Sequence, residues 1–427
     1  MTDRSSGRSP VARIQQIVAE GLCIGCGLCQ GIAGASAIQM TRSQQGYLVP
    51  ELRQSASSAD LQLILEVCPS IKLAAMEDPH NDEHSHSDPV WGVWRRIAHY
   101  HAADPSECYQ GASGGVLTAL AVYLLKSGQV DFILHARASG KDPLLGESCL
   151  SFNRDQVLEA AGSRYAPTAV LINIREVLER SQPFVVIGKP CDISALRNYA
   201  RHDPRVNQLV RYWLTFVCGG FMPPEGTAKF LRDRAIDPDN VSRLRYRGHG
   251  FPGPVHVETL DDQQFDFSYV EFWGEDYKRW TLPHRCKICP DSIGEAADLV
   301  AADPWPGGGP DPEHLEAPGN NVILCRSKAG ENLLQQATAS AALAVGSEGS
   351  IEMLNDYQPH QVARKFTAWP RFQGLEAEGR LVPESSGLRI RELAETMDAA
   401  FLRQQREGMR QRVREGKAWD ALPADSS

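Results

Sequence analysis

No apolar run in this sequence is long enough to cross a bilayer. The best candidate, residues 116–125, is about half the length of a spanning helix and predicts a buried helix instead. The first residues contain no apolar signal core, so we expect no export and a cytoplasmic location. An excess of positive charge is also missing: the formal net charge of −9 disfavours nucleic acid or an anionic membrane as the main partner.

Cysteine, by contrast, is abundant, with 11 residues in a chain of 427. Disulfides are rare in a reducing compartment, so this number predicts metal or redox chemistry. The hydrophobic content of 42% and the charged content of 23% are ordinary for a globular protein. A chain of this length can bury a large core and form two or three domains.

Three cysteines lie at C-x-x-C-x-x-C spacing in a glycine-rich segment: Cys23, Cys26 and Cys29. This spacing supplies three ligands of a cubane iron–sulfur cluster, and the glycines let backbone amides approach the sulfides. A Cys-Pro pair follows a predicted helix over residues 59–67, and we expect its Cys68 to be the fourth ligand. A structural zinc site is the alternative.

A second C-x-x-C pair, Cys286 and Cys289, is followed by proline and an acidic run. Two thiolates at this spacing reach one metal centre, so two further ligands are needed. Cys191 and Cys218 each follow a predicted strand, at the carboxyl end where α/β sheets place their ligands. The four cysteines therefore predict a second cubane cluster, although either lone cysteine could be a buried inert residue. The remaining cysteines, which we expect to be structural, are Cys108, Cys149 and Cys325.

Residues 111–115, Gly-Ala-Ser-Gly-Gly, lead into a predicted helix that ends at Gly128. Ser113 can cap this helix, and the bare amides of a glycine-rich helix start suit a phosphate. Arg164 and Tyr165, in the segment GSRYAPTA, could hold a phosphate or stack on a ring, or could form an ordinary surface loop.

Residues 248–253 match G-x-G-x-x-G, but prolines flank the third glycine and a strand follows, so we reject a dinucleotide site. Arg245, Arg247 and His249 remain candidates to face a cofactor or an acidic substrate.

Residues 388–416 predict one charged amphipathic helix, which is typical of a packing or subunit element. Two clusters beside a phosphate-binding domain indicate an electron-transfer protein. A flavin is the expected organic cofactor, because it exchanges single electrons with clusters and two electrons with an organic substrate.

These motifs resemble those of the coenzyme F420 hydrogenase/dehydrogenase beta-subunit family. The resemblance rests on CIGCGLC, Cys68-Pro69, GASGGVLTAL, GSRY, GKPCDISALR and RCKICPD, between about residue 20 and about residue 330. The runs YRGHGFPGP, FWGED and RCKICPDSIGEAADLVAADPWPGG are most similar to a branch that reduces chlorophyll-type tetrapyrroles at an 8-vinyl or 7-hydroxymethyl group. The resemblance implies FAD, two [4Fe-4S] clusters and reduced ferredoxin as electron donor.

The resemblance also implies a role for particular residues. It gives one cluster Cys23, Cys26, Cys29 and Cys68, and the other Cys191, Cys218, Cys286 and Cys289. Near FAD it places Gly111, Ser113, Gly114, Gly115, Thr118, Ser163, Arg164, Tyr165 and Lys189.

We therefore expect an α/β fold in three parts. Residues 1–88 form a ferredoxin-like [4Fe-4S] module and a linker, residues 89–345 an α/β FAD-binding core with the second cluster, and residues 346–427 a C-terminal helical segment. The expected function is a ferredoxin-dependent reductase of a conjugated cyclic small molecule, with a chlorophyll-type tetrapyrrole as first choice. His249 and Glu275 are candidate proton donors, and a homo-oligomer is compatible with these features.

Two other functions stay open. One is an electron-transfer beta subunit of a hydrogenase or dehydrogenase complex that uses the deazaflavin coenzyme F420, and a copurifying partner subunit would favour it. The other is a non-catalytic electron carrier or a zinc-bound scaffold, which would contain no flavin.

Overall fold

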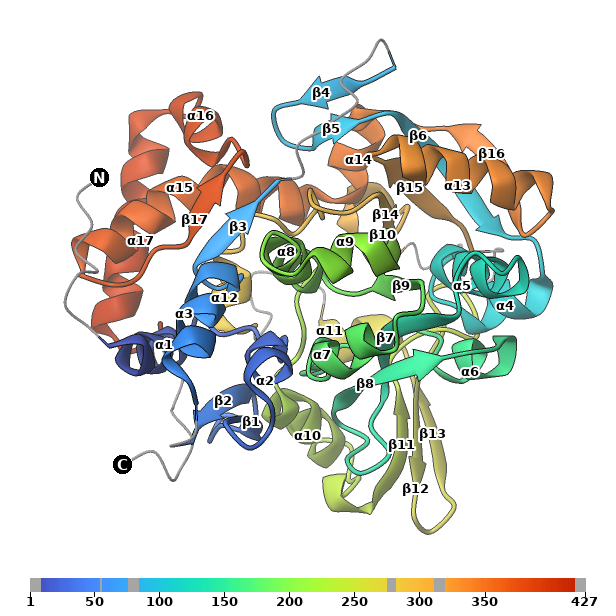
Figure 1. The fold of residues 1–427 in the computed structure, drawn as a ribbon, viewed down its shortest axis with the longest axis horizontal. Coiled ribbons are helices and arrows are strands. Elements are labelled where there is room, and N and C mark those ends of the chain that lie inside the picture. Colours follow the sequence, from blue (N-terminus) through green and yellow to red (C-terminus); the bar gives the residue numbers. More distant parts are fainter. Residues whose placement is uncertain (1–8, 54–55, 76–83, 275–281, 311–318, 419–427) are drawn as a thin grey trace.

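A mixed eight-stranded sheet forms the centre of the protein (Figure 1). The structure is a computed structural model that describes residues 9–53, 56–75, 84–274, 282–310 and 319–418. The strand order is β16-β6-β15-β14-β10-β9-β7-β8. The four central strands are parallel to one another: β14 (Leu299–Ala302), β10 (Val210–Phe216), β9 (Phe184–Ile187) and β7 (Phe132–Ala138). The outer strands are antiparallel: β8 (Gly146–Ser151), β15 (Asn321–Cys325), β6 (Arg96–Ala102) and β16 (Leu343–Glu348).

Strands β9 and β14 are continuous apolar runs because helices cover both faces of the sheet. On one face, Ile133, Val185 and Leu214 pack against α5 (Val116–Lys126) and α13 (Lys328–Ala339). On the other face, the alternate strand residues pack against α7 (Ile174–Glu179), α8 (Pro190–Tyr199) and α9 (Pro204–Leu209). The α/β class expected from the sequence is confirmed.

The N-terminal cysteines belong to a small layer that packs beside the large sheet. It contains α1 (Pro10–Ala19), α2 (Leu28–Ala33), the hairpin of β1 (Ile38–Arg42) and β2 (Leu48–Leu52), and α3 (Ser58–Val67). The helix expected over residues 59–67 is therefore confirmed. This layer contacts α7 and α8, so the first cysteines lie close to the helix that contains Cys191 in its first turn.

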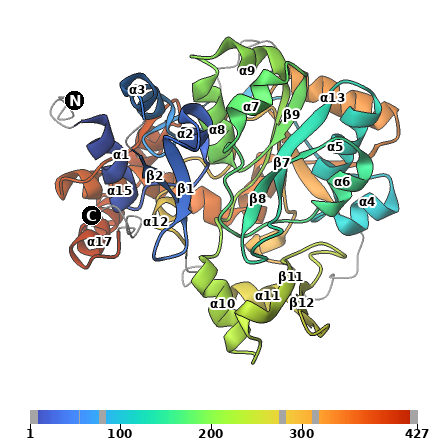
Figure 2. The ribbon, with the colours of Figure 1, turned by 60° about the horizontal axis from the view of Figure 1, so that its bottom comes forward.

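A separate three-stranded sheet lies below the large sheet in Figure 2. Its strands are β11 (Val241–Arg245), β12 (Val255–Thr259) and β13 (Gln264–Phe267), and α10 (Pro224–Arg232) and α11 (Tyr269–Trp273) pack against it. β12 and β13 form a hairpin with its turn at Asp261-Asp262. Asp262 takes the left-handed conformation that such a turn requires.

The C-terminal helices pack against the N-terminal layer. They are α14 (Ile351–Tyr357), α15 (Pro359–Ala377), α16 (Ile390–Glu395) and α17 (Ala399–Arg414), and β17 (Glu384–Ser386) pairs in parallel with β3 (Lys72–Ala74). The single helix expected over residues 388–416 is wrong, because the chain breaks after α16 and Asp398 caps a new helix. The expected boundary at residue 346 lies inside β16, so the sheet extends slightly beyond it. Among the described helices, none combines the length and apolarity that a bilayer span requires.

Candidate functional site

Neighbouring parallel strands bring polar residues to one edge of the large sheet. The chain leaves β9 at Ile187 and reaches Lys189 and Cys191 at the start of α8. It leaves β10 at Phe216 and reaches Cys218, and it leaves β14 at Ala302 and reaches Asp303. Carboxyl ends of parallel strands meet at the same edge, so residues far apart in the sequence become neighbours there. The expected position of Cys191 and Cys218 after strands is confirmed.

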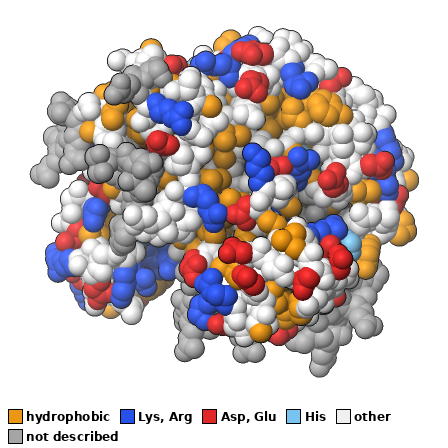
Figure 3. Space-filling model, turned by 90° about the horizontal axis from the view of Figure 1, so that it is seen from below, with side chains coloured by type: hydrophobic (Ala, Val, Ile, Leu, Met, Phe, Trp, Pro, Cys, Tyr) orange, Lys and Arg blue, Asp and Glu red, His pale blue; other side chains and the backbone are white. Residues whose placement is uncertain are grey.

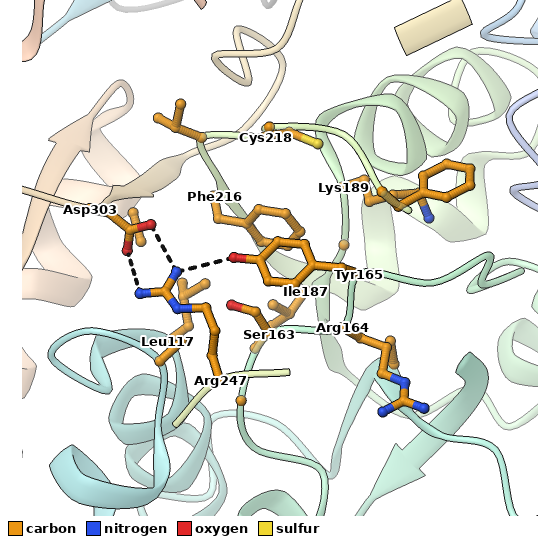
Figure 4. A pocket seen from close by; sticks show the side chains of 18 of the residues that line it. Leu117, Ser163, Arg164, Tyr165, Ile187, Lys189, Phe216, Cys218, Arg247 and Asp303 are labelled. Atoms are coloured by element: carbon orange, nitrogen blue, oxygen red, sulfur yellow. Dashed lines mark hydrogen bonds and ion pairs between the residues drawn. The ribbon is translucent and has the colours of Figure 1, made fainter. Parts of the chain in front are cut away.

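A cleft opens at this edge, with about 1650 Å³ of empty space when its open mouth is included. Apolar and aromatic side chains form much of its wall, and ten of the lining residues are labelled in Figure 4. On the outer surface, apolar side chains gather in a hollow near the middle of the face that Figure 3 shows. Of the residues expected near FAD, those that line the cleft are Gly115, Thr118, Ser163, Arg164, Tyr165 and Lys189.

An ion pair between Arg247 and Asp303 forms one wall of the cleft (Figure 4). Arg247 Nη1 donates to Asp303 Oδ2 at 2.8 Å, and Nη2 donates to Asp303 Oδ1 at 3.2 Å. Burial opposes the charge on Arg247, but Asp303, Tyr165 and Tyr269 together raise the pKa of the guanidinium. Arg247 Nη1 also donates to the hydroxyl of Tyr165 at 3.2 Å, and the guanidinium lies 4.7 Å from the centre of the Trp305 ring.

Ser113 does not cap helix α5 as expected. Its hydroxyl donates to Asp303 and accepts from Arg247, and Gly115 in the left-handed conformation is the N-cap residue instead. The amide of Gly114 donates to Asn321 Oδ1 at 3.0 Å, so that amide is already occupied.

The glycines of this segment serve close packing. A Cβ atom on Gly114 would lie 2.6 Å from the Cα atom of Asn320, and one on Gly111 would lie 2.5 Å from the Cα atom of Gly115. Neither Gly111 nor Gly114 is among the residues that line the cleft. Of the proposed phosphate site, only Ala112 and the start of α5 at Gly115 and Thr118 line the cleft.

Arg164 points away from the other labelled side chains in Figure 4. Its guanidinium donates to the carbonyl oxygens of Pro143, Leu145 and Leu244, and it lies over the ring of Tyr246 at 5.1 Å. Through these hydrogen bonds, the side chain of Arg164 holds its own loop against residues 143–145 and strand β11. A phosphate-binding role for Arg164 does not fit this arrangement.

Lys189 lies at the wall of the cleft and bonds to the first turn of helix α8. Its Nζ donates to Asp192 Oδ2 at 2.8 Å and to the carbonyl of Thr168 at 3.1 Å. Burial opposes its charge, but Asp192 and Cys191 raise the pKa of Lys189. The lysine therefore stays positively charged at the wall of the cleft.

The four N-terminal cysteines, the first cysteine set, lie around one small cavity: Cys23, Cys26, Cys29 and Cys68. Burial raises the pKa of Cys26 and Cys68, and it raises the pKa of Cys29 to about 12. Neighbouring thiolates add to this effect, because Cys68 raises the pKa of both Cys26 and Cys29. The structure thus brings together the four residues that the sequence predicts.

The second cysteine set is also gathered in one place: Cys191, Cys218, Cys286 and Cys289. Burial raises the pKa of Cys191 and Cys218 and raises that of Cys286 to about 12; the charges of neighbouring cysteines contribute in each case. Cys286 lies in α12 (His284–Lys287), and Cys218 lines the cleft. In the described residues no three Cys, His, Asp or Glu side chains converge on the position of a single ion. A four-iron cluster presents a different iron to each thiolate, so its ligands need not converge in that way.

Of the two candidate proton donors, His249 is not among the residues that line the cleft. Its ring packs at a tilt against Tyr109, with ring centres 5.1 Å apart. Burial and the charge of Arg245 lower the pKa of His249. Glu275 lies outside the described residues. Asp303, which does line the cleft, was not singled out from the sequence; its one signal is its place directly after an apolar strand.

The fold and the site define an α/β protein with two partly buried cysteine sets and an aromatic-lined cleft. The chain belongs to the coenzyme F420 hydrogenase/dehydrogenase beta-subunit family: the description of the subunit's N-terminal part matches residues 99–175, and that of its C-terminal part matches residues 182–350. Together the two matches cover more than half of the chain. The family expected from the motifs is confirmed.

Among the relatives, the coenzyme F420-dependent sulfite reductase of Methanocaldococcus jannaschii is 23% identical over 336 residues, which are 75% of this chain and 47% of that protein. The F420-dependent formate dehydrogenase 1 subunit beta of Methanococcus maripaludis is 29% identical over 204 residues, 47% of this chain and 50% of that protein. The chloroplastic 7-hydroxymethyl chlorophyll a reductase of Oryza sativa is 25% identical over 213 residues, 49% of this chain and 43% of that protein. All three are oxidoreductases by name, and this chain spans about half the length of each.

A solved structure has the same fold. A chain of the F420-reducing [NiFe] hydrogenase complex from Methanosarcina barkeri superposes with a TM-score of 0.53 at 18% identity, covering 70% of this chain and 98% of that chain. Two of the three relatives above carry coenzyme F420 in their names, as do both family descriptions. The comparisons therefore favour the F420 alternative over the chlorophyll-type substrate that we expected first.

Proposed function

We propose that this chain is an iron–sulfur flavoprotein oxidoreductase that carries electrons between two [4Fe-4S] clusters and FAD, with a deazaflavin of the F420 type as its organic redox partner. The observation that carries this proposal is the position of Cys218. It belongs to the second cysteine set and also lines the cleft. An electron held at that set is therefore adjacent to a molecule bound in the cleft.

The cysteine sets suit iron–sulfur clusters chemically. Burial raises the pKa of six of the eight thiols, so the bare thiolates would be unstable where they lie. Coordination to a metal deprotonates a thiol outright and removes this penalty. The C-x-x-C-x-x-C spacing followed by a distant Cys-Pro favours [4Fe-4S] over zinc for the first cysteine set.

The cleft suits a flavin by its size and its wall. Leu117, Ile187 and Phe216 give apolar surface on the side of the large sheet, and Tyr165 faces them (Figure 4). Lys189, paired with Asp192, brings its ammonium group to the wall of the cleft, where a phosphate could accept a hydrogen bond from it. A bound flavin exchanges single electrons with clusters and two electrons with an organic partner, which is the conversion that this arrangement requires.

Arg247 and Asp303 position the wall of the cleft. The ion pair is nearly neutral overall, and its hydrogen bond to Tyr165 holds the phenol ring at the surface of the cleft. Tyr165 packs edge-on against Trp273, with ring centres 4.9 Å apart. The aromatic side chains on this side keep water away from that part of the cleft.

A spectroscopic titration tests the choice of redox partner. Anaerobically purified protein would be mixed with reduced coenzyme F420 while the flavin and cluster absorbances are followed. We expect the flavin to bleach first and the clusters to follow. No bleaching by reduced F420, with bleaching by reduced ferredoxin, would contradict the F420 assignment.

A second candidate is reduction of a chlorophyll-type tetrapyrrole with ferredoxin as donor. The likeness to the Oryza sativa reductase supports it. The same protein, reduced by ferredoxin, would be incubated with divinyl and hydroxymethyl chlorins and the products separated by chromatography. A reduced chlorin would favour this candidate, and unchanged chlorins would exclude it.

A further inference from the structure

We infer that Arg285 is a buried counter-charge shared by the two cysteine sets, and that it raises the reduction potentials of both centres at the place where electrons pass between them. The inference rests on the proposed iron–sulfur function and adds to it a role for a residue that is not a ligand.

The side chain of Arg285 extends from the second cysteine set to the first. Arg285 precedes Cys286 in helix α12. Its Nη2 donates to the carbonyl oxygen of Pro69 at 3.3 Å, and Pro69 follows Cys68 directly. The guanidinium thus lies between a cysteine of each set.

Arg285 is buried without an anionic partner. It is 2% exposed, and its Nε atom has no hydrogen-bond acceptor. Within the described part of the chain, no carboxylate forms an ion pair with it. Two other buried cations do have such a partner: Arg247 pairs with Asp303, and Lys365 pairs with Glu295. Arg326, 1% exposed, has none among the described residues, but it donates to three backbone carbonyl oxygens, whereas Arg285 donates to one.

A buried positive charge without an anion strongly destabilises a fold. Four thiolates outweigh the charge of a [4Fe-4S] core, so a cluster together with its ligands is an anion, and two such anions flank Arg285.

Lys189 provides a contrast at another point between the sets. Its charge acts on both Cys191 and Cys26, but Asp192 neutralises it through a hydrogen bond of 2.8 Å. Arg285 therefore contributes a net positive charge, whereas Lys189 and Asp192 together contribute little. A net positive charge in a medium of low dielectric favours the reduced, more negative form of a nearby cluster.

The test is a potentiometric titration of the full chain, purified anaerobically with its clusters and followed by electron paramagnetic resonance. We expect Arg285→Met to shift the midpoint potentials of both clusters to more negative values and Arg285→Lys to remain close to the wild type. Lys287→Met is the matched control, because this lysine carries the same charge in the same helix but is partly exposed. Solvent screens its charge, so its removal should shift the potentials less.

A shift of one cluster or of neither in Arg285→Met, with both clusters present, would overturn the inference. An equal shift in Lys287→Met would overturn it as well. If Arg285→Met fails to bind iron, the iron content of Arg285→Lys decides: full iron supports a counter-charge, and loss in both variants indicates a packing role. Wild-type protein without iron would instead overturn the proposed function itself.

Discussion

Arg247 and Asp303 join the two sheets of the protein through a two-pronged ion pair, with N–O distances of 2.8 and 3.2 Å. Arg247 follows β11 of the three-stranded sheet, and Asp303 follows β14 of the large sheet. Ser113 and Tyr165 also bond to the guanidinium, so four chain segments meet at one wall of the cleft. The shape of the cleft therefore depends on one buried contact.

Asp303→Asn should destabilise the protein by about 3 kcal/mol, because it leaves the guanidinium of Arg247 buried without an anion. Flavin binding should fall with it, since the wall of the cleft loses its anchor. Chemical denaturation and flavin content are the measurements. The matched control is Asp142→Asn, which removes a partly exposed pair with Arg42 and should cost less than about 1 kcal/mol. Equal effects of both variants would contradict this account.

Cys286→Ser should remove about half of the iron and leave the first cysteine set loaded, if each set holds one four-iron cluster. Cys26→Ser should remove the other half and reduce ferredoxin-driven turnover, while bound flavin is retained. Iron, sulfide and flavin would be quantified on each variant. Cys149→Ser, in strand β8 and outside both sets, should keep full iron. Complete loss of all cofactors from both ligand variants would exclude two independent centres.

Gly114→Ala should destabilise the protein by about 1–3 kcal/mol, because a Cβ atom there would lie 2.6 Å from the Cα atom of Asn320. The displaced loop should also weaken flavin binding, which a fluorescence titration measures. Gly140→Ala is the control, since a Cβ atom at that position meets nothing within 4 Å. A Gly114→Ala protein as stable as this control would show that the close approach is not required.

His135 should make the protein less stable as the pH falls below neutrality. It is 8% exposed in strand β7; burial first, and then the charge of Arg137, lower its pKa to about 4. Between the ordinary histidine pKa of about 6.5 and this value, the unfolded state binds a proton that the folded state does not. Stability is therefore lost as the pH falls through that window, by about 2 kcal/mol between pH 7 and pH 5.

The measurement for His135 is urea denaturation at both pH values, on wild type and on His135→Asn. The variant should lose less stability on acidification, because it lacks the group that takes up the proton. The same loss in both proteins would assign the acid sensitivity to other groups.

The strands and their ends could be predicted from the sequence because apolar runs bounded by glycine and proline are local signals. That is why Cys191 and Cys218 were placed correctly at the edge of the sheet. Asp303 could not be recognised, because its partner Arg247 is 56 residues away and the two meet only after the sheets pack. Ser113 shows the same effect: its local tendency to cap a helix is overridden by the buried ion pair.

The C-terminal segment was the least predictable part. Its charged pattern is compatible with one helix over residues 388–416, and only the hydrogen bonds of Asp398 to Ala400 and Phe401 mark the start of a new helix. This segment packs on the N-terminal layer, where β17 pairs with β3. Pairing between segments so far apart leaves little trace in a single sequence.

The central claim is that two iron–sulfur clusters and a flavin share this chain. Anaerobic purification followed by quantitation of iron, sulfide, zinc and flavin on one sample tests it most directly. The account predicts about eight irons, the number in two cubane clusters, and one FAD per chain. Zinc without flavin would contradict the account and identify the cysteine sets as structural metal sites.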